Sequence, residues 1–467
     1  MKKTEQNTII QYNRNITDFL NVDYLQWAFS VVEERALPSV IDGLKPTARK
    51  VLHAAFTGTL KDGKLAKLLA LSGDAMKLSL YSHGDSSLAG VCAGLCKTFT
   101  QNLNPLESDS QVGSLRDPNA CGAPRYLYVK LSDYANSIYK TDIELTERIF
   151  EEGQYVEPMC YYPIIPTVLT SNNQGIAVGY AMHNQSYDPV DIIDCCIECL
   201  KMKDMSKDPF KTVINPYVKG IKKANWRLQD GKWYNYGEWK VNKSRDLFTV
   251  IDLPADTSYE QFEKLLNKLQ DAQYIKDWKN LSSDGNINYE VQFFKGQLSK
   301  LCKGKNAEMT IVNKLKLIKQ LPDDLLWLID ENHKLKFFKD KYDVVRYFTN
   351  YRLSIYTERK KRTVKLLEEK YKQNSDLVKF IELVCKGKLK IRNRSKVDIK
   401  VDMDEFKLPM TLISTPMSRC TIEERDELLK ENEEIKKKLE YIKATTEKQM
   451  YINDLTALRK QLVNDFK

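Results

Sequence analysis

The carboxyl-terminal third of the chain carries two stripes of hydrophobic residues at helical spacing. The first stripe consists of Val344, Phe348, Tyr351 and Ile355, and the second, with nearly heptad spacing, of Leu428, Ile435, Leu439 and Ile442. Thr421 and Glu424 have the spacing of a capping box, which marks the start of a helix. We therefore predict two long paired helices within 336–467, with a small globule between them at about 375–420. An antiparallel coiled coil that serves only as a spacer would give the same pattern.

Hydrophobic and polar positions alternate in the middle of the chain, over Lys232–Val241 and Leu247–Leu253, which is typical of strands. Asp191–Cys199 instead has the spacing of an amphipathic helix. Residues 24–135 alternate short helical patterns with polar turns, as a winged-helix domain does, and Ser86 is expected to cap an apolar helix that includes Leu88, Val91, Leu95 and Phe99. These patterns predict an α+β chain of several domains.

Composition changes this picture little. A chain of 467 residues, 42% of them hydrophobic, can form two or three globular domains. The net charge of +10 modestly favours a polyanionic partner, although many basic proteins never bind nucleic acid. No hydrophobic run reaches the roughly 20 residues that cross a bilayer, and Met1–Asn7 lacks the apolar core of a signal peptide. We therefore expect a cytoplasmic protein that has no membrane contact.

The ten cysteines give no pair of Cys-x-x-Cys arms that could enclose a zinc ion. Their densest group, Cys195, Cys196 and Cys199, falls in the predicted amphipathic helix and has no histidine near it in the sequence. A thiol in an intracellular protein is usually a small buried hydrophobic group. We therefore favour packing over metal binding for this group and predict no metal site in the chain.

Candidate chemistry lies in the segment Gly122–Ser132, which contains the dipeptide Arg125–Tyr126. A tyrosine phenol can attack a phosphodiester and form a phosphotyrosine ester close in energy to the bond it replaces, so the reaction is reversible without added fuel. The phenol, with a pKa of about 10, needs nearby cations that favour the phenolate and offset charge on the phosphate. Arg125 is such a cation, although an Arg-Tyr pair on a surface strand is common and Tyr128 would serve the same argument.

Four further segments occur in a fixed order around this dipeptide. They are Tyr24–Ser30 with Glu34–Pro46 and Arg49–Leu52, then Tyr81–Ser86, then Ile164–Leu169, and finally Gly175–Gly179. Together with Gly122–Ser132 they resemble the breakage-reunion subunits of type IIA DNA topoisomerases over nearly the whole chain. Within that family, the Ala-Pro-Arg-Tyr context and the short length look most like the medium subunit of T4-like bacteriophages, and next like the cleavage region of the eukaryotic enzyme.

The resemblance implies a multidomain α+β fold, the core of a type IIA topoisomerase A subunit. It implies an amino-terminal arm at 1–23, a winged-helix DNA-cleavage domain at 24–135 and a tower domain at 136–335. The remaining segment, 336–467, would be the coiled coil, with an exit-gate globule at about 375–420 that forms a second dimer contact.

The same resemblance implies roles for individual residues. Tyr126 would be the nucleophile, and Arg125, Arg35 and His83 would stabilise charge and position DNA. Lys45 and Arg49 would contact phosphates, although a solvated basic turn is the plainer alternative. Ile176 would wedge between base pairs and help to bend the duplex, whereas a Gly-flanked isoleucine is by default a core residue.

Cofactors and partners follow from what the family needs. Its enzymes use an ATPase domain and a Toprim fold that holds Mg²⁺, and neither is recognisable in this sequence. We therefore expect a large partner subunit that supplies ATP hydrolysis and Mg²⁺, a second copy of this chain as homodimer partner, and double-stranded DNA as substrate. Relaxation or decatenation of DNA is the expected task, since the DNA-wrapping domain of gyrases is also missing.

Two motifs are set aside. Gly58–Lys64 has the spacing of a phosphate-binding loop, but Leu65 stands where Ser or Thr should hold magnesium, and the preceding residues indicate a helix. Asp402 and Asp404 imitate an acidic metal pair but fall in the expected exit-gate globule. Ser82, Ala48 and Gly90 depart from the family pattern, so the sequence gives no basis for predicting drug response.

Two other classes of function compete with this interpretation. A DNA-binding scaffold could bend or bridge duplexes without cutting them, and the intact Arg125–Tyr126 pair argues against it. A tyrosine recombinase also forms phosphotyrosine links, but its nucleophile usually lies near the carboxyl terminus and follows an Arg-His-Arg constellation. The position of Tyr126 disfavours that class.

Overall fold

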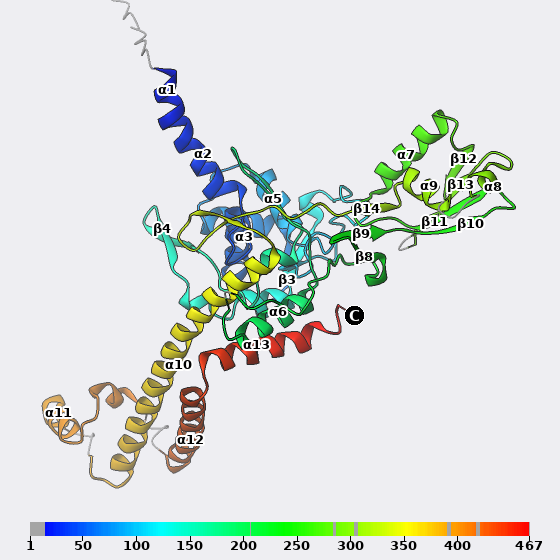
Figure 1. Ribbon diagram of the computed structural model, residues 1–467. Helices are drawn as coiled ribbons and strands as arrows, with labels where there is room; N and C mark the ends of the chain where they lie inside the picture. Colours follow the sequence, from blue (N-terminus) through cyan, green and yellow to red (C-terminus); the bar gives the residue numbers. More distant parts are fainter. Residues whose placement is uncertain are drawn as a thin grey trace, which may run out of the picture. The chain divides into compact units, whose positions relative to one another are not determined.

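The computed structural model describes residues 15–205, 207–283, 286–302, 307–389, 394–416 and 421–466 (Figure 1). The chain divides into two compact units. One unit comprises the residues up to Thr349 together with those from Ala457 onward, and the other is Asn350–Thr456. Both helices and sheets are present, which confirms the α+β class, while the domain boundaries given above stay predictions. No helix in the described ranges is long and apolar enough to cross a membrane.

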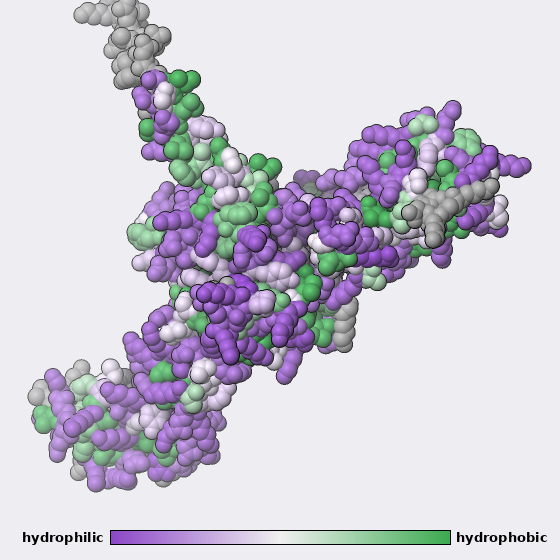
Figure 2. Space-filling model, in the orientation of Figure 1, coloured by the Kyte–Doolittle hydropathy of each residue, from purple (hydrophilic) through white to green (hydrophobic). Residues whose placement is uncertain are grey.

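The first unit begins with a continuous helical run (Figure 1). It consists of α1 (Ile16–Asp18), a π-helical turn at Phe19–Tyr24, α2 (Leu25–Val31) and a second π-helical turn at Val32–Ala36. Asn15 caps the run, since its side chain accepts a hydrogen bond from the Thr17 amide. Figure 2 shows hydrophobic residues gathered along α1 and α2, and most of these side chains are exposed.

Three helices and a three-stranded sheet follow the helical run. The helices are α3 (Pro46–Thr57), α4 (Leu68–Leu78) and α5 (Asp85–Gly94). The sheet has the order β1 (Ala66–Lys67), β3 (Tyr128–Leu131), β2 (Leu106–Glu107), and both pairings are antiparallel. Pro46 stands in the first turn of α3, where its missing N–H costs nothing.

The expected cap of α5 at Ser86 is wrong. The helix begins one residue earlier, at Asp85, and it ends at Gly94, so Leu95 and Phe99 lie beyond it. The Asp85 carboxylate accepts a hydrogen bond from the Ser86 amide at 2.7 Å, and an acidic residue is favourable at the positive end of a helix. Gly84 stands at the N-cap of α5, which has no side-chain cap hydrogen bond, so Asp85 contributes only its negative charge in the first turn.

Short hairpins and one amphipathic helix make up the next part of the first unit. The hairpins are β4 (Arg148–Glu151) with β5 (Gln154–Pro158), and β6 (Gln174–Ile176) with β7 (Ala181–His183). The helix α6 (Pro189–Lys201) is capped by the Asp188 side chain. Cys195, Cys196 and Cys199 are fully buried on α6, and burial raises the pKa of the Cys196 thiol to about 12. The packing role predicted for these thiols fits this position.

The strands predicted in the middle of the chain are confirmed. One sheet has the order β14 (Ile318–Gln320), β9 (Lys232–Tyr236), β8 (Trp226–Gln229). The other has the order β10 (Glu238–Asn242), β11 (Leu247–Asp252), β13 (Tyr289–Gln292), β12 (Asp277–Asn280). Helices α7 (Tyr259–Asp271), α8 (Gln297–Leu301) and α9 (Ala307–Lys314) accompany them, and residues such as Phe248, Phe262 and Ile311 form one buried core. A last hairpin, β15 (Leu326–Ile329) with β16 (Leu335–Phe338), precedes the long helix.

The second unit contains most of α10 (Lys341–Cys385), then α11 (Lys396–Glu405), α12 (Ile422–Ala444) and the start of α13 (Glu447–Leu462). Within it α10 and α12 pair, as Lys370 and Asn374 both bind Glu431. Thr421 caps α12 through the Glu424 amide, as its spacing predicts. A small core of Phe380, Leu389, Ile399, Met403 and Leu408 lies where the globule was expected, although α10 continues to Cys385.

Candidate functional site

Tyr126 lies at the end of a single 3-10 turn, Pro124–Tyr126, directly before β3. Its amide donates to the Ala123 carbonyl at 2.9 Å, and the side chain is 67% exposed. The Arg125 guanidinium lies 5.0 Å from the centre of the Tyr126 ring. Backbone geometry therefore presents the phenol to solvent with a permanent cation beside it.

The chain just after Tyr126 is firmly held. Leu127 is buried, and its carbonyl accepts a hydrogen bond from the Leu68 amide at the start of α4. Tyr128 is fixed on the other side, because its amide donates to the Ser110 hydroxyl and its carbonyl accepts from the Ser108 hydroxyl. Tyr128 is also 40% exposed, so exposure alone does not choose between the two tyrosines. The adjacent arginine favours Tyr126.

A second group of predicted residues gathers around the β6–β7 hairpin. The Lys45 ammonium donates to the Gln174 carbonyl at 2.7 Å. A Cβ atom at Gly175 would lie 2.4 Å from the Ala36 carbonyl oxygen, so the strand β6 can run this close only with glycine there. Ala36 follows Arg35 and Gly175 precedes Ile176, so this close approach brings the backbone beside Arg35 against the backbone beside Ile176. Ile176 is 87% exposed, which rules out the core role that a Gly-flanked isoleucine usually has.

Three cations line one cleft of about 460 Å³, on which residues of α3 and the end of α5 also border. They are Arg35, Lys45 and Lys97. Burial lowers the pKa of Lys45, and the oxygen that its ammonium contacts is a neutral carbonyl. The Lys45 ammonium is thus partly dehydrated, and the oxygen it contacts carries no negative charge. Such a group is suited to bind an anion such as a DNA phosphate.

The structure contradicts the phosphate contact predicted for Arg49. Its side chain is buried, and the guanidinium binds both carboxylate oxygens of Asp42, at 2.7 and 3.1 Å. Asp42 also accepts hydrogen bonds from the Leu44 and Tyr161 amides. Arg49 therefore neutralises a buried carboxylate that organises the chain before α3.

His83 lies in the exposed loop between α4 and α5, with its ring centre 5.5 Å from that of Tyr81. Among the described residues, no hydrogen bond or ion pair joins His83 to Tyr126 or to Arg35. Apart from the buried Arg49, the predicted residues lie in three places: Arg125 with Tyr126, Arg35 with Lys45 and Ile176, and His83 by itself.

The protein-family model for the A subunit of DNA gyrase and topoisomerase IV matches residues 35–459. The chain belongs to this family. Relatives of this topoisomerase-family chain include the mitochondrial DNA topoisomerase 2 of Dictyostelium discoideum, 28% identical over 86% of this chain and 31% of that protein. The DNA topoisomerase 2 of Plasmodium falciparum is 27% identical over 94% of this chain and 34% of that protein.

The fold agrees with the family assignment. The crystal structure of the Plasmodium falciparum topoisomerase II DNA-binding, cleavage and re-ligation domain superposes with a TM-score of 0.82 at 24% identity, covering 96% of this chain and 65% of that one. The chain spans about a third or less of the length of the curated relatives it matches, such as 23% of mouse DNA topoisomerase 2-beta. The α+β core expected of a type IIA A subunit is therefore confirmed as a fold.

In this topoisomerase-family chain, residues at the two motifs set aside, Gly58–Lys64 and Asp402 with Asp404, make contacts of other kinds. The Thr59 amide and hydroxyl both bind the Asp74 carboxylate at 2.6 Å, and a carboxylate there would repel a phosphate. Asp402 pairs with Arg394. Within the part of the chain that the structure describes, no group of three or more His, Cys, Asp or Glu side chains could hold a metal ion. The side chains around Tyr126 therefore do not fit a Mg²⁺ site.

Sequence reasoning missed two basic residues of this topoisomerase-family chain. Lys97 borders the cleft with Arg35 and Lys45, but it follows α5 outside any motif. Arg116 is buried in the loop before Tyr126, where an arginine gives no pattern that could distinguish it from a surface residue. Only the folded arrangement shows what either residue contacts.

Proposed function

We propose that this chain is the DNA-cleaving and rejoining subunit of an ATP-dependent type II DNA topoisomerase. The Tyr126 oxygen would attack a backbone phosphorus, forming a 5′-phosphotyrosine bond while the bond to the 3′ oxygen breaks. The phenol loses its proton, and the released 3′ oxygen gains one. The reverse attack reseals the strand after a second duplex has passed, which relaxes or decatenates DNA. The exposed Tyr126 beside Arg125, in a chain of this family, carries the proposal.

The other residues have supporting roles in this proposal. Arg125 would favour the phenolate and offset charge on the phosphate oxygens, because its guanidinium stays protonated. Arg35 and Lys45 would hold the DNA backbone at their shared cleft, and His83 would position it from the exposed loop between α4 and α5. The exposed Ile176 would enter the base stack and bend the duplex.

Mg²⁺ and ATP would come from a partner. The metal, when bound by a Toprim fold of a large subunit, would supply charge neutralisation at the scissile phosphate. The same subunit would carry the ATPase domain. The exposed apolar side chains of the helical run from α1 to α2, such as Phe19, Trp27 and Phe29, support a protein partner, because surfaces of this kind are rarely left uncovered.

The assembly would contain two copies of this chain, in contact through the cleavage domain and the exit gate, so that each Tyr126 cuts one strand. The Ala-Pro-Arg-Tyr context around Tyr126 supports assigning this chain as the medium subunit of a T4-like bacteriophage topoisomerase. Its role would be in DNA replication in the host cytoplasm. Whether the large subunit is one chain or two would not alter the chemistry assigned to Tyr126.

The test is a cleavage assay on the assembled enzyme. Supercoiled plasmid, the large subunit with Mg²⁺ and one form of this chain are incubated together, and cleavage is trapped with detergent. The forms compared are the wild type, Tyr126→Phe and Tyr128→Phe. We expect linear DNA with protein on both 5′ ends for the wild type and Tyr128→Phe, and none for Tyr126→Phe. Cleavage that survives in Tyr126→Phe would assign the chemistry elsewhere, and DNA binding without cleavage by any form would identify a scaffold.

A further inference from the structure

The segment Gln111–Gly122, named here the tyrosine loop, is a closed loop whose ends meet just before the 3-10 turn of Tyr126. The Gly122 amide donates to the Gln111 carbonyl at 2.9 Å, and the carbonyl of the next residue, Ala123, accepts a hydrogen bond from the Tyr126 amide. At the tip, Gly113 has a φ of +95°, and a Cβ there would lie 2.8 Å from the Pro118 carbonyl. The position of Tyr126 therefore depends on how this loop is held.

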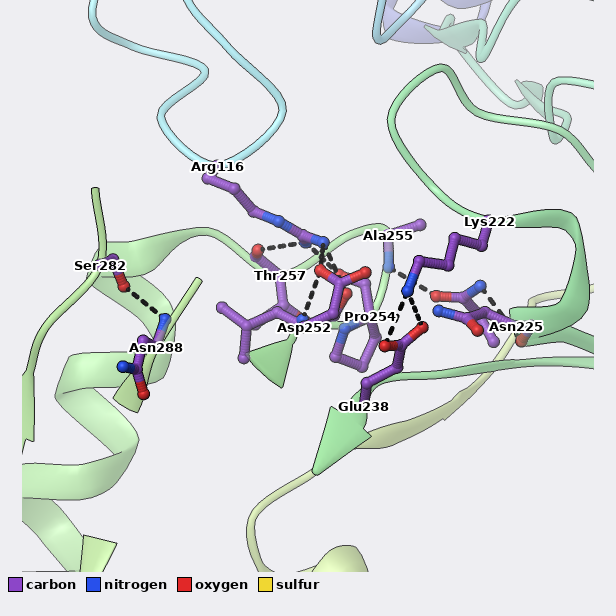
Figure 3. Close-up of polar contacts among 12 residues, drawn as sticks. Arg116, Lys222, Asn225, Glu238, Asp252, Pro254, Ala255, Thr257, Ser282 and Asn288 are labelled. Carbon is purple, nitrogen blue, oxygen red and sulfur yellow. Dashed lines mark hydrogen bonds and ion pairs between the residues drawn. The ribbon is translucent and has the colours of Figure 1, made fainter. Parts of the chain in front are cut away.

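Arg116, near the tip of the tyrosine loop, joins it to the end of β11 and the connection to α7 (Figure 3). One Nη atom donates to the Pro254 carbonyl at 2.6 Å and the Thr257 carbonyl at 3.1 Å. The other donates to the Asp252 carboxylate at 2.8 Å and the Leu253 carbonyl at 2.6 Å. We call these four contacts the Arg116 clamp.

Backbone and apolar contacts reinforce the Arg116 clamp. The Arg116 carbonyl accepts a hydrogen bond from the Tyr259 amide at 2.9 Å. The neighbouring Leu115 packs against a small buried cluster that includes Trp226 and Ala255. On the other side of the loop, the Lys97 ammonium donates to the Pro118 carbonyl at 3.1 Å. The sheet β10–β11–β13–β12 together with α7 is named here the β10–β13 module. The tyrosine loop is thus tied both to this module and to the segment that directly follows α5.

The chemistry of the clamp is specific to arginine. Arg116 is 8% exposed, and dehydrating a guanidinium is costly unless its donors are satisfied. Its planar group supplies donors in fixed directions, which three carbonyls and one carboxylate accept here. Lysine could keep the charge but could not reach all four acceptors from one nitrogen. A loop that only needed closing at its base would not require a buried cation at its tip.

We propose that Arg116 is a positioning residue for Tyr126, acting through the tyrosine loop, and that it ties the nucleophile to the seating of the β10–β13 module. This inference rests on the proposed role of Tyr126. When the module is seated against the loop, the Gln111–Gly122 contact fixes Ala123 and hence the Tyr126 amide. When the clamp is open, the tyrosine still lies at the surface but loses its fixed approach to the phosphorus, and misplacement near 1 Å costs about 100-fold in rate.

The experiment compares Arg116→Ala and Arg116→Lys with a matched control, Lys222→Ala. Lys222 and Arg116 border one cavity, and Lys222 pairs with Glu238 at 2.6 Å, but no hydrogen bond of that ammonium reaches the tyrosine loop in the described structure. Three quantities are measured: DNA affinity, the rate of DNA cleavage at saturating enzyme in the complete complex, and amide exchange in the 119–127 peptide. The exchange measurement needs no catalysis.

For Arg116→Ala we expect faster exchange at Gly122 and Tyr126, DNA affinity within about 2-fold of wild type, and a cleavage rate at least about 10-fold lower. Arg116→Lys should fall between, and Lys222→Ala should match the wild type. Wild-type cleavage by Arg116→Ala would overturn the proposal. So would affinity and cleavage that fall by the same factor, because this would indicate loss of folded protein. If the wild type itself does not cleave, or Tyr126→Phe does, the proposed function fails, while unchanged exchange in Arg116→Ala would reject the clamp separately.

Discussion

The buried His53 of α3 and the exposed Arg148 of β4 approach each other, with 3.5 Å between the imidazole Nε2 and a guanidinium nitrogen. His53 is 5% exposed, and burial, helped by the Arg148 charge, lowers its pKa to about 4. Lys50 adds to this effect, and Glu157, which pairs with Lys50 at 2.6 Å, opposes it. The ring is therefore neutral near pH 7, as suits a histidine packed in the interior.

This environment predicts loss of stability in mild acid. In the unfolded chain a histidine has a pKa of about 6.5, so between about pH 6.5 and pH 4 the unfolded state binds more protons than the folded state. The free energy of unfolding must fall as pH falls through this window, by up to about 3 kcal/mol from this group. His53→Gln should remove that part of the slope in urea unfolding followed from neutral to acid pH.

The control for this prediction is His333→Gln, a substitution at a histidine whose side chain is 44% exposed. It should leave the slope between neutral and acid pH as in the wild type. An unchanged slope in His53→Gln would assign the acid sensitivity to carboxylates instead.

The sequence could select some residues of the candidate site and not others. Tyr126, Arg125, Arg35 and Lys45 could be selected because their motifs occur together in the sequence, and each is placed where DNA could reach it. Arg49 could not be judged in this way. Whether an arginine faces solvent or a buried carboxylate depends on the path of the chain from Asp42 to α3, and the sequence pattern is the same in both cases.

At the scale of elements, the β6–β7 hairpin depends on one residue without a side chain. Gly175→Ala would place a Cβ 2.4 Å from the Ala36 carbonyl oxygen, and backbone cannot move aside cheaply. We expect the substitution to lower the free energy of unfolding by about 1–3 kcal/mol and to displace Ile176. Denaturant unfolding measures the first effect, and loss of DNA bending in an end-to-end fluorescence transfer assay measures the second.

Gly90→Ala is the matched control for this glycine. A Cβ at Gly90 meets nothing within 4 Å, and the residue lies within α5. Alanine there should stabilise the protein by about 0.5–1 kcal/mol, the opposite sign. Equal stability of Gly175→Ala and wild type would mean that the hairpin can move away from Ala36. Ile176 would then not be held in a fixed position.

The sequence could predict those elements in which a hydrophobic pattern repeats over many residues. The alternation at Leu247–Leu253 gave β11, and the heptad stripe gave α12. The two-residue strands β1 and β2 and the 3-10 turn at Tyr126 are too short to show any period, although they hold the proposed nucleophile. Their conformation is imposed by contacts with distant segments, such as the bond from Leu68 to Leu127.

The molecule as a whole leaves an extended apolar surface on α1 and α2 uncovered. Trp27 is 54% exposed and Phe29 61%, whereas Ala28 between them is buried, so the apolar side chains project from the helix rather than into this unit. The chain also lacks, within its described residues, the carboxylate cluster that the proposed chemistry takes from a partner. One partner subunit would meet both needs, because covering the helix would bring the metal-holding subunit to the segment that leads into Arg35.

This arrangement predicts that Trp27→Glu weakens assembly with the large subunit. Loss of a central aromatic anchor commonly costs about 2 kcal/mol or more, so the dissociation constant should rise by at least about 10-fold in sedimentation or calorimetry. DNA affinity and thermal stability of the isolated chain should stay the same, since the ring is exposed there. Gln26→Glu adds the same charge on the same exposed helix without removing apolar surface, and it should assemble normally. If Trp27→Glu instead weakens self-association and leaves large-subunit binding intact, the helix serves the second copy of this chain, and the metal-holding partner must reach Tyr126 by another surface.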